Sequence, residues 1–313
     1  MLRIVRRRVL ISIPLLLVVS LTTFVLESLV PGDFAASLLG ENYTQAQYNA
    51  LRQSMHLNQP LAEQYWRYLT GVFQGHLGDS LVSNESVTTA ISERLPVTLT
   101  LIVGAVVVAA SVGIFLGVQS AIRGRFWRRL VDVLSLLGVA LPSFWLGLVL
   151  VAFFAVRLGW FPASGYTPFS TSPYQWVQSL ALPVVALSVL GIASISKVTR
   201  DGMLSALQTE YTKTLRAAGV SQRSLIWKHG LRNSSVAIAT MIGLTAVQFI
   251  AATVFIENVF ALPGMGLLIV NATVQHDLPV VQGVTLVFTL LVIAINLIID
   301  LCYGALDPKV RLS

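Results

Sequence analysis

Long apolar stretches alternate with shorter polar segments along most of this chain. Five of the stretches carry no charged residue, and their lengths match the roughly 20 helical residues that cross the hydrocarbon core of a bilayer. They start at Val97, Val133, Leu180, Ser234 and Leu278. A sixth stretch, residues 9–30, contains one acidic residue, Glu27, near its far end. The pattern predicts an all-α membrane protein with six transmembrane helices.

The predicted helices divide the chain into spans and connecting segments. The spans are residues 9–30, 97–122, 130–156, 180–199, 234–256 and 280–303. The segments outside them are 1–8, 31–96, 123–129, 157–179, 200–233, 257–279 and 304–313. The first span follows an arginine cluster, so a cleaved signal peptide is the alternative interpretation. Its apolar length exceeds the roughly 7 to 15 residues of a signal peptide core, and we therefore favour a retained helix.

Composition and charge exclude an ordinary soluble domain and orient the chain. Hydrophobic residues make up 55% of the 313 residues and charged residues 11%, against about 25% charged residues in soluble domains. With a cytoplasmic N-terminus, all but four of the 21 Lys and Arg residues lie at the cytoplasmic side of the predicted spans. Because basic residues mark cytoplasmic segments, both termini are expected on the cytoplasmic side of the membrane.

The outer segment, residues 31–96, is too long and polar to be a simple turn. It contains stretches that are compatible with helices, from Ala46 to Met55 and from Leu61 to Val72. The second stretch includes Trp66, an aromatic residue of the kind that is enriched at membrane interfaces. We expect a small folded cap on the extracytoplasmic side. The cap is either a passive cover over the helix ends or a docking face for an external partner, and the sequence leaves both open.

The long inner segment, Lys197 to Arg232, predicts two short helices with a hinge. The first begins at Glu210 and stops at Gly219, whose lack of a Cβ suits the left-handed position after a helix end. Ser221 can then cap a second short helix that runs to about Arg232. The basic residues of this segment do not by themselves distinguish it from an ordinary cytoplasmic loop.

Prolines and small residues inside the spans are interpreted as packing devices. Pro142 predicts a kink in the third span. Gly113 and Gly117 have the Gly-x-x-x-Gly spacing that allows two helices to approach closely. No function follows from these residues alone.

Several kinds of chemistry are missing from the sequence. Gly264-Met265-Gly266 lacks the lysine of a phosphate-binding P-loop, and no zinc-protease or serine-hydrolase motif occurs. The single cysteine, Cys302, excludes a disulfide within the chain. An ion-coupled carrier would keep an ionisable residue near the bilayer midplane. The candidates Glu27, Asp132, Lys197 and Asp300 all lie near span ends. A membrane enzyme and a self-powered secondary transporter are both disfavoured, and an external energy source is implied.

Seven patches of sequence, in a fixed order, are similar to one family. They are residues 31–33, 142–147, 158–165, 257–266, 276–283, 296–303 and 306–309. In them, and essentially from end to end, the chain resembles the transmembrane permease subunits of bacterial ABC importers in the dipeptide, oligopeptide and nickel branch. Within that branch it resembles the first of two paired permeases, with residues 97–303 as the permease core.

The resemblance implies a type I importer fold and assigns a role to the inner segment. In the family a glutamate, two small residues and a glycine form the bend that docks into a groove on the ATPase subunit. The matching residues are Glu210, Ala217, Ala218 and Gly219. Tyr211 follows the glutamate where a small residue is common in the family.

The family also implies the partners. They are a homologous second permease, two ABC ATPases that bind ATP and Mg²⁺, and an extracytoplasmic solute-binding protein. The permease itself is expected to be non-catalytic, without a cofactor or metal, and to lie in the bacterial cell membrane. Peptides are the favoured substrate, and nickel, glutathione or short glycosides are the alternatives, because no substrate-binding residue can be identified from the sequence.

Overall fold

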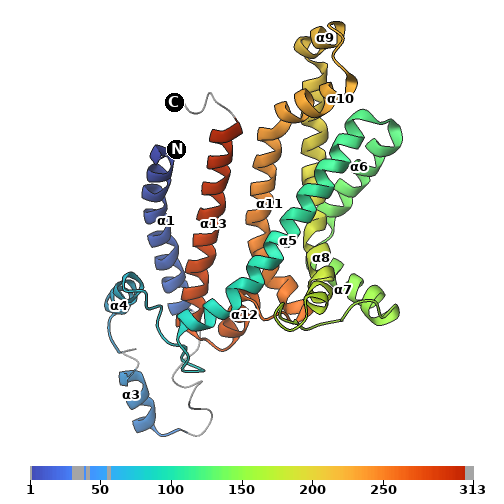
Figure 1. Cartoon of the computed structure of the whole chain (residues 1–313). Coiled ribbons are helices and arrows are strands. Elements are labelled where there is room, and N and C mark those ends of the chain that lie inside the picture. The colour runs from blue at the N-terminus through green and yellow to red at the C-terminus, as the bar shows by residue number, and fades with distance from the viewer. Residues whose placement is uncertain (1, 30–38, 40–42, 55–57, 307–313) are drawn as a thin grey trace. The chain divides into compact units, whose positions relative to one another are not determined.

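The computed structural model describes residues 2–29, 39, 43–54 and 58–306, and their regular secondary structure is helical (Figure 1). The first part of the described chain forms α1 (Leu2–Ser28), α3 (Gln45–Ser54), α4 (Leu61–Phe73) and α5 (Val87–Ile122). The middle of the chain forms α6 (Arg125–Ala140), α7 (Ser143–Leu150), the π-helix η1 (Val151–Arg157) and α8 (Pro173–Gln208). The remainder forms α9 (Glu210–Ala217), α10 (Gln222–Ser224), the π-helix η2 (Leu225–Gly230), α11 (Leu231–Phe260), α12 (Met265–Val274) and α13 (Leu278–Leu306).

Within the described residues, four helical runs are long and apolar enough to cross a membrane. They are Val87–Ile122, Pro173–Gln208, Gln222–Phe260 and Leu278–Gly304. The bent pair formed by α6 and the α7–η1 run makes a fifth candidate. The apolar part of α1 is shorter, from Leu10 to Leu26. The prediction of an all-α membrane protein is confirmed, with four to five apolar spans.

The third predicted span, residues 130–156, is not one kinked helix, and this corrects the prediction. α6 ends at Ala140, α7 begins at Ser143, and the two parts are bent by 103°. Leu141 and Pro142 between them have extended ψ angles of 121° and 137°. Proline lacks an N–H group and disfavours the helical conformation of the preceding residue. At this position both effects break the helix completely.

Most helices extend beyond the uncharged stretches that predicted them. α5 begins at Val87 and α8 runs from Pro173 to Gln208, because a helix continues past the bilayer wherever its polar residues can remain in water. The outer segment 257–279 was predicted as a loop, yet it contains α12. The cap stretches at 46–55 and 61–72 are confirmed as α3 and α4, except that Met55 lies outside the described residues. The motifs at 31–33 and 307–309 also lie outside them.

The chain forms two compact units. The larger contains Val97–Pro263 and the second half of α13 from Val292, together with the first residues of the chain. The smaller contains Arg7–Pro96 and Gly264–Leu291.

In the larger unit α8 is the central helix and packs against α6, α7 and α11. Close approach between α5 and α8 depends on the two glycines of the Gly-x-x-x-Gly spacing. A Cβ on Gly117 would lie 2.5 Å from the Cβ of Thr199, and one on Gly113 would lie 2.9 Å from the Cβ of Ile195. The interpretation of this spacing as a packing device is confirmed. In the same unit, the Tyr303 hydroxyl of α13 donates to Thr240 Oγ1 of α11 at 2.7 Å.

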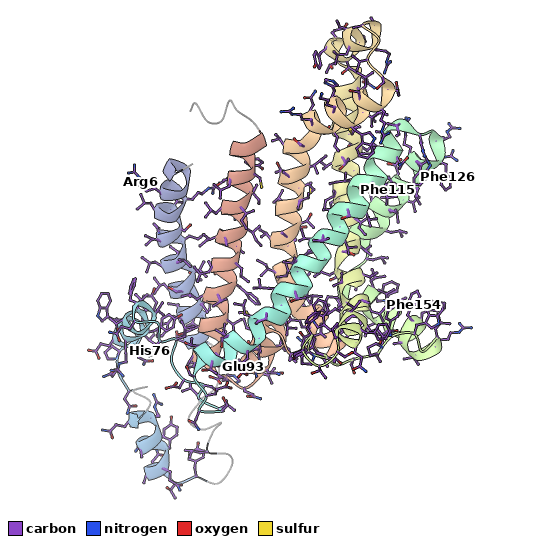
Figure 2. The ribbon with its side chains drawn as sticks, in the orientation of Figure 1. Arg6, His76, Glu93, Phe115, Phe126 and Phe154 are labelled. Carbon is purple, nitrogen blue, oxygen red and sulfur yellow. The ribbon has the colours of Figure 1, made fainter. Side chains whose placement is uncertain are left out.

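The turn between α5 and α6 carries an aromatic cluster. Figure 2 shows Phe115 on α5 and Phe126 on α6, and both rings meet the ring of Trp127 edge-on, at centroid distances of 6.4 and 6.0 Å. The guanidinium of Arg123 lies 5.8 Å from the centroid of the Trp127 ring. These contacts fix the short connection that joins the second and third apolar segments.

The smaller unit has its own apolar core. It is formed by Val87, Ile91, Met265, Val280 and Val284, from the starts of α5 and α13 and from α12. A buried carboxylate holds the loop before α5 in place.

That carboxylate belongs to Asp277, which is 3% exposed and sits just before α13. It accepts a hydrogen bond from Ser80 Oγ at 2.5 Å and one from the backbone N–H of Leu81 at 3.1 Å. Through these two hydrogen bonds, the buried Asp277 carboxylate joins the loop before α5 to the start of α13.

Candidate functional site

The site begins where α8 passes into α9, and two threonines fix this junction. Thr209 leaves the helical conformation, with ψ of 150°, and its side chain caps α9 by accepting from the Thr212 N–H at 3.4 Å. The hydroxyls of both threonines donate to the backbone oxygen of Ala206, at 2.9 and 2.8 Å. Thr212 is 1% exposed. The last turn of α8 and the first turn of α9 are therefore one hydrogen-bonded unit.

α9 ends in a Schellman motif at Gly219. The Val220 N–H donates to the Leu215 oxygen and the Gly219 N–H to the Arg216 oxygen, both at 3.1 Å. These are the two bonds that define this helix end, and they place the residue after the cap in the left-handed region. Gly219 has a φ of +80°, as the sequence predicted.

The chain then turns directly into the next helical run. The Ser221 side chain caps it by accepting from the Ser224 N–H at 3.3 Å, so the predicted cap is confirmed. The predicted end at Arg232 is wrong, because α10, η2 and α11 follow one another without a break through Phe260. The run contains no proline or left-handed residue that would end it near Arg232. The second predicted helix is therefore the first part of the long helical run Gln222–Phe260.

The four motif residues lie on α9 and the turn that ends it. Ala217, Ala218 and Gly219 are exposed, and no atom lies within 4 Å of the position that a Cβ on Gly219 would occupy. Glu210 begins the helix, about 13 Å away along the axis. Its carboxylate is 87% exposed and pairs with the Lys213 ammonium at 2.6 Å. An ion pair this exposed contributes little to stability, so the carboxylate is available to a partner.

A contact that the sequence did not indicate ties α9 to η2. The Tyr211 hydroxyl lies 3.3 Å from His229 Nδ1, and the two rings meet edge-on with centroids 5.9 Å apart. Tyr211, which departs from the family pattern, thus joins α9 to η2, because a small residue could not reach His229 across the bend. Nothing in the spacing of the two residues predicts the pair.

A basic and aromatic surface adjoins the turn. A shallow hollow is lined by Ser221, Arg223, Ser224, Trp227 and Lys228. The Trp227 side chain is 51% exposed, while the neighbouring Leu225 and Ile226 are buried and anchor the run. The hollow offers an indole face and two cations to a partner that carries acidic or apolar groups.

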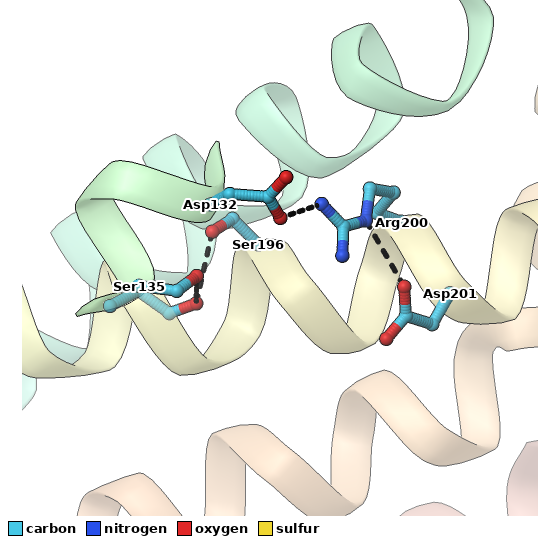
Figure 3. A network of polar contacts seen from close by, with 6 residues as sticks. Asp132, Ser135, Ser196, Arg200 and Asp201 are labelled. Atoms are coloured by element: carbon cyan, nitrogen blue, oxygen red, sulfur yellow. Dashed lines mark hydrogen bonds and ion pairs between the residues drawn. The ribbon is translucent and has the colours of Figure 1, made fainter. Parts of the chain in front are cut away.

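On the other side of the junction, α8 is fastened to α6 by a polar network (Figure 3). Arg200 of α8 donates to Asp132 of α6 at 2.5 Å and to Asp201 of its own helix at 3.1 Å. The Arg200 side chain is 12% exposed, so the ion pair with Asp132 is shielded on one side. One turn further along α6, Ser135 Oγ donates to the Ala193 oxygen of α8 at 3.3 Å. These two contacts join α8 to α6.

A cavity of about 230 Å³ opens at the break between α6 and α7. Its walls are mostly apolar and include Leu141, Pro142, Leu187 and Phe249. The described residues contain no group of three or more His, Cys, Asp or Glu side chains that could hold a metal ion.

The long apolar helices and the exposed bend at Gly219 are compared next with known proteins. Residues 109–312 match the family of the binding-protein-dependent transport system inner membrane component, and residues 1–102 match the N-terminal family of the same components. The chain belongs to this family, and it is a membrane subunit of a binding-protein-dependent ABC importer.

Named relatives cover nearly the whole chain. It is 40% identical to the putative peptide transport system permease protein of Brucella abortus (strain 2308), over 97% of this chain and 98% of the relative. It is 35% identical to the probable peptide ABC transporter permease protein of Sinorhizobium fredii, with the same coverage. It is 36% identical to the glutathione transport system permease protein GsiC of Salmonella paratyphi A, over 99% of both chains.

Proposed function

We propose that this chain forms one half of the pathway by which an ATP-driven importer moves peptides into a bacterial cell. The observation that carries the proposal is the exposed Schellman bend at Gly219, with Ala217 and Ala218 beside it and open space around it. Small residues let another backbone approach closely, and the left-handed glycine turns the chain within two residues. A bend of this kind suits the groove of a partner ATPase.

The contacts around the bend suggest how force reaches the membrane. When the ATPases close on ATP, the bend would move with them, and two routes lead away from it. One runs through Thr209 and Thr212 into α8 and then through Arg200 and Asp132 into α6. The other runs through the unbroken helical run into α11. Rocking of packed helices between inward-facing and outward-facing states is a known mode of such transitions.

The proposed membrane arrangement has six spans. α1 would supply the sixth, with its apolar part from Leu10 to Leu26, and both termini would be cytoplasmic. Residues 31–96 would form the extracytoplasmic cap and residues 97–303 the permease core. The basic residues at the cytoplasmic side of the predicted spans support this orientation.

The proposed assembly contains this chain, a homologous second permease, two ABC ATPases and a solute-binding protein outside. ATP and Mg²⁺ would be bound and ATP hydrolysed by the ATPases, while this subunit remains non-catalytic. The family description, which names a binding-protein-dependent transport system, supports the ATPases and the solute-binding protein as partners.

Peptides are proposed as the substrate because two of the relatives carry peptide transport in their names. Glutathione is the second candidate, favoured by the third relative, whose name specifies it. Both are chains of amino acids, so the chemistry of the pathway would be similar.

The test is uptake by proteoliposomes that contain the complete complex, purified through a tag on this chain. Dipeptides, pentapeptides, glutathione and Ni²⁺ are offered separately with the co-purified binding protein and ATP. Accumulation of a peptide or of glutathione supports the proposal. Accumulation of Ni²⁺ alone, or co-purification without any ATPase subunit, would overturn it.

A further inference from the structure

The helix α4 in the outer segment has a clean division between apolar and polar faces. With 3.6 residues per turn, its apolar side chains fall within an arc of roughly 160°. The arc contains Leu61, Ala62, Tyr65, Trp66, Tyr68, Leu69, Val72 and Phe73. The opposite face carries Glu63, Gln64, Arg67 and Thr70.

The middle of the apolar arc rests on α1, through Tyr65. The Tyr65 hydroxyl lies 2.9 Å from Ser20 Oγ and 3.3 Å from the backbone oxygen of Leu17. The rings of Phe24 and Tyr65 have centroids 5.4 Å apart. These contacts fix α4 against the outer half of α1, within the same compact unit.

One edge of the arc is uncovered. Trp66 is 68% exposed and Phe73 is 82% exposed, and they lie seven residues apart on one side of the helix. α1 also exposes apolar side chains, among them Val18 at 60% and Leu26 at 59%.

The contacts with α1 set the depth of α4. Ser20 lies about 15 Å beyond Leu10 and about 9 Å before Leu26 along the helix axis. If α1 spans the bilayer, the Tyr65 ring reaches into the hydrocarbon of the outer leaflet. The axis of α4 must then lie near the boundary between hydrocarbon and headgroups, where indole and phenol side chains are favoured.

We propose that α4 is an in-plane membrane helix whose uncovered edge, Trp66 and Phe73, is buried among the lipid acyl chains of the outer leaflet. Glu63, Arg67 and Thr70 then face the headgroups and water, as in interfacial amphipathic helices. The inference rests on the proposed function in one respect, namely that α1 is a membrane span. It makes this part of the cap an anchor for α1, and Trp66 is not available to a solute-binding protein.

The test measures which side chains of α4 meet lipid. Cys302 is replaced by serine, and single cysteines are introduced by W66C, F73C, E63C and T70C for spin labelling. The complete complex is placed in nanodiscs of phosphatidylethanolamine and phosphatidylglycerol. Power saturation then compares collisions of each label with O₂, which concentrates in hydrocarbon, and with a water-soluble nickel chelate. Labels at 66 and 73 are expected to favour O₂, and labels at 63 and 70 the nickel chelate.

A V18C label on α1 separates the two possible failures. If this label favours O₂ while labels at 66 and 73 meet the nickel chelate as often as those at 63 and 70, the inference about α4 is wrong and the six-span proposal stands. If labels at 66 and 73 are shielded from both reagents, a protein covers them, and the lipid assignment is equally wrong. If the V18C label is itself in water, α1 is not a span and the proposed topology fails.

Discussion

Replacement of Gly219 by tryptophan separates docking from folding. Gly219 has a φ of +80°, and no atom lies within 4 Å of a Cβ built there. A side chain at this position therefore starts in open space, and strain in the backbone is the expected cost within the subunit. The left-handed conformation costs a non-glycine residue about 1–2 kcal/mol. Any larger effect on transport must come from the indole meeting a partner.

The matched control is Gly219→Asn. Asparagine visits the left-handed region far more readily than tryptophan does, and its side chain is small. Both variants are expected to insert and to purify with the partner permease, because the bend is stabilised by backbone bonds from Val220 and Gly219 that neither substitution removes. The tryptophan variant alone is expected to lose the coupling between ATP hydrolysis and uptake.

The assay uses reconstituted complexes with the solute-binding protein and its ligand. Uptake and the ligand-stimulated rate of ATP hydrolysis are measured for wild type and for both variants. The expected result is near-normal stimulation for Gly219→Asn and none for Gly219→Trp, at equal amounts of inserted protein. Normal coupling with tryptophan at the bend would refute the docking role.

Three further substitutions test other contacts. Asp132→Asn should lower uptake, whereas Asp201→Asn should not, because only Asp132 joins α6 to Arg200. Since the Asp132 side chain is exposed, loss of the ion pair should cost only about 1 kcal/mol of stability, measured as a small drop in Tm. Gly117→Ala should destabilise the protein by about 1–3 kcal/mol through overpacking against α8. Gly124→Ala is its control, because a Cβ on Gly124 meets nothing within 4 Å. Equal melting temperatures of the two variants would contradict the close approach of α5 and α8. Asp277→Ala removes the acceptor of the buried Ser80 hydroxyl and of the partly buried Leu81 N–H, at a cost of about 1–3 kcal/mol. It should speed proteolysis of the loop before α5, and an unchanged cleavage rate would show that Asp277 does not hold this loop.

The helix end at Gly219 and the helix cap at Ser221 could be predicted from the sequence because both depend on contacts between residues that are close in the chain. A glycine two residues beyond the end of a helical pattern and a serine two residues later are signals that act within one turn of helix. Gly219 and Ser221 accordingly take the predicted conformations. The family resemblance then supplied the role of the bend, which no single residue could indicate.

The features that the sequence missed depend on long-range contacts or on competing local effects. The pair of Tyr211 and His229 forms only because the bend brings α9 back onto η2. The ion pair of Arg200 and Asp132 joins residues on separate helices, and neither position marks the other. At Pro142 the direction of the effect was predicted, but the size was not. A kink and a complete break use the same proline, and the surrounding packing decides between them.

The central claim is that this subunit moves its substrate only when ATPases act on the loop that ends at Gly219. The most direct measurement compares liposomes that contain the complete complex with liposomes that contain this chain alone. We expect peptide to accumulate only with the complete complex, the binding protein and ATP. Accumulation by the chain alone under an ion gradient, without ATP, would contradict it.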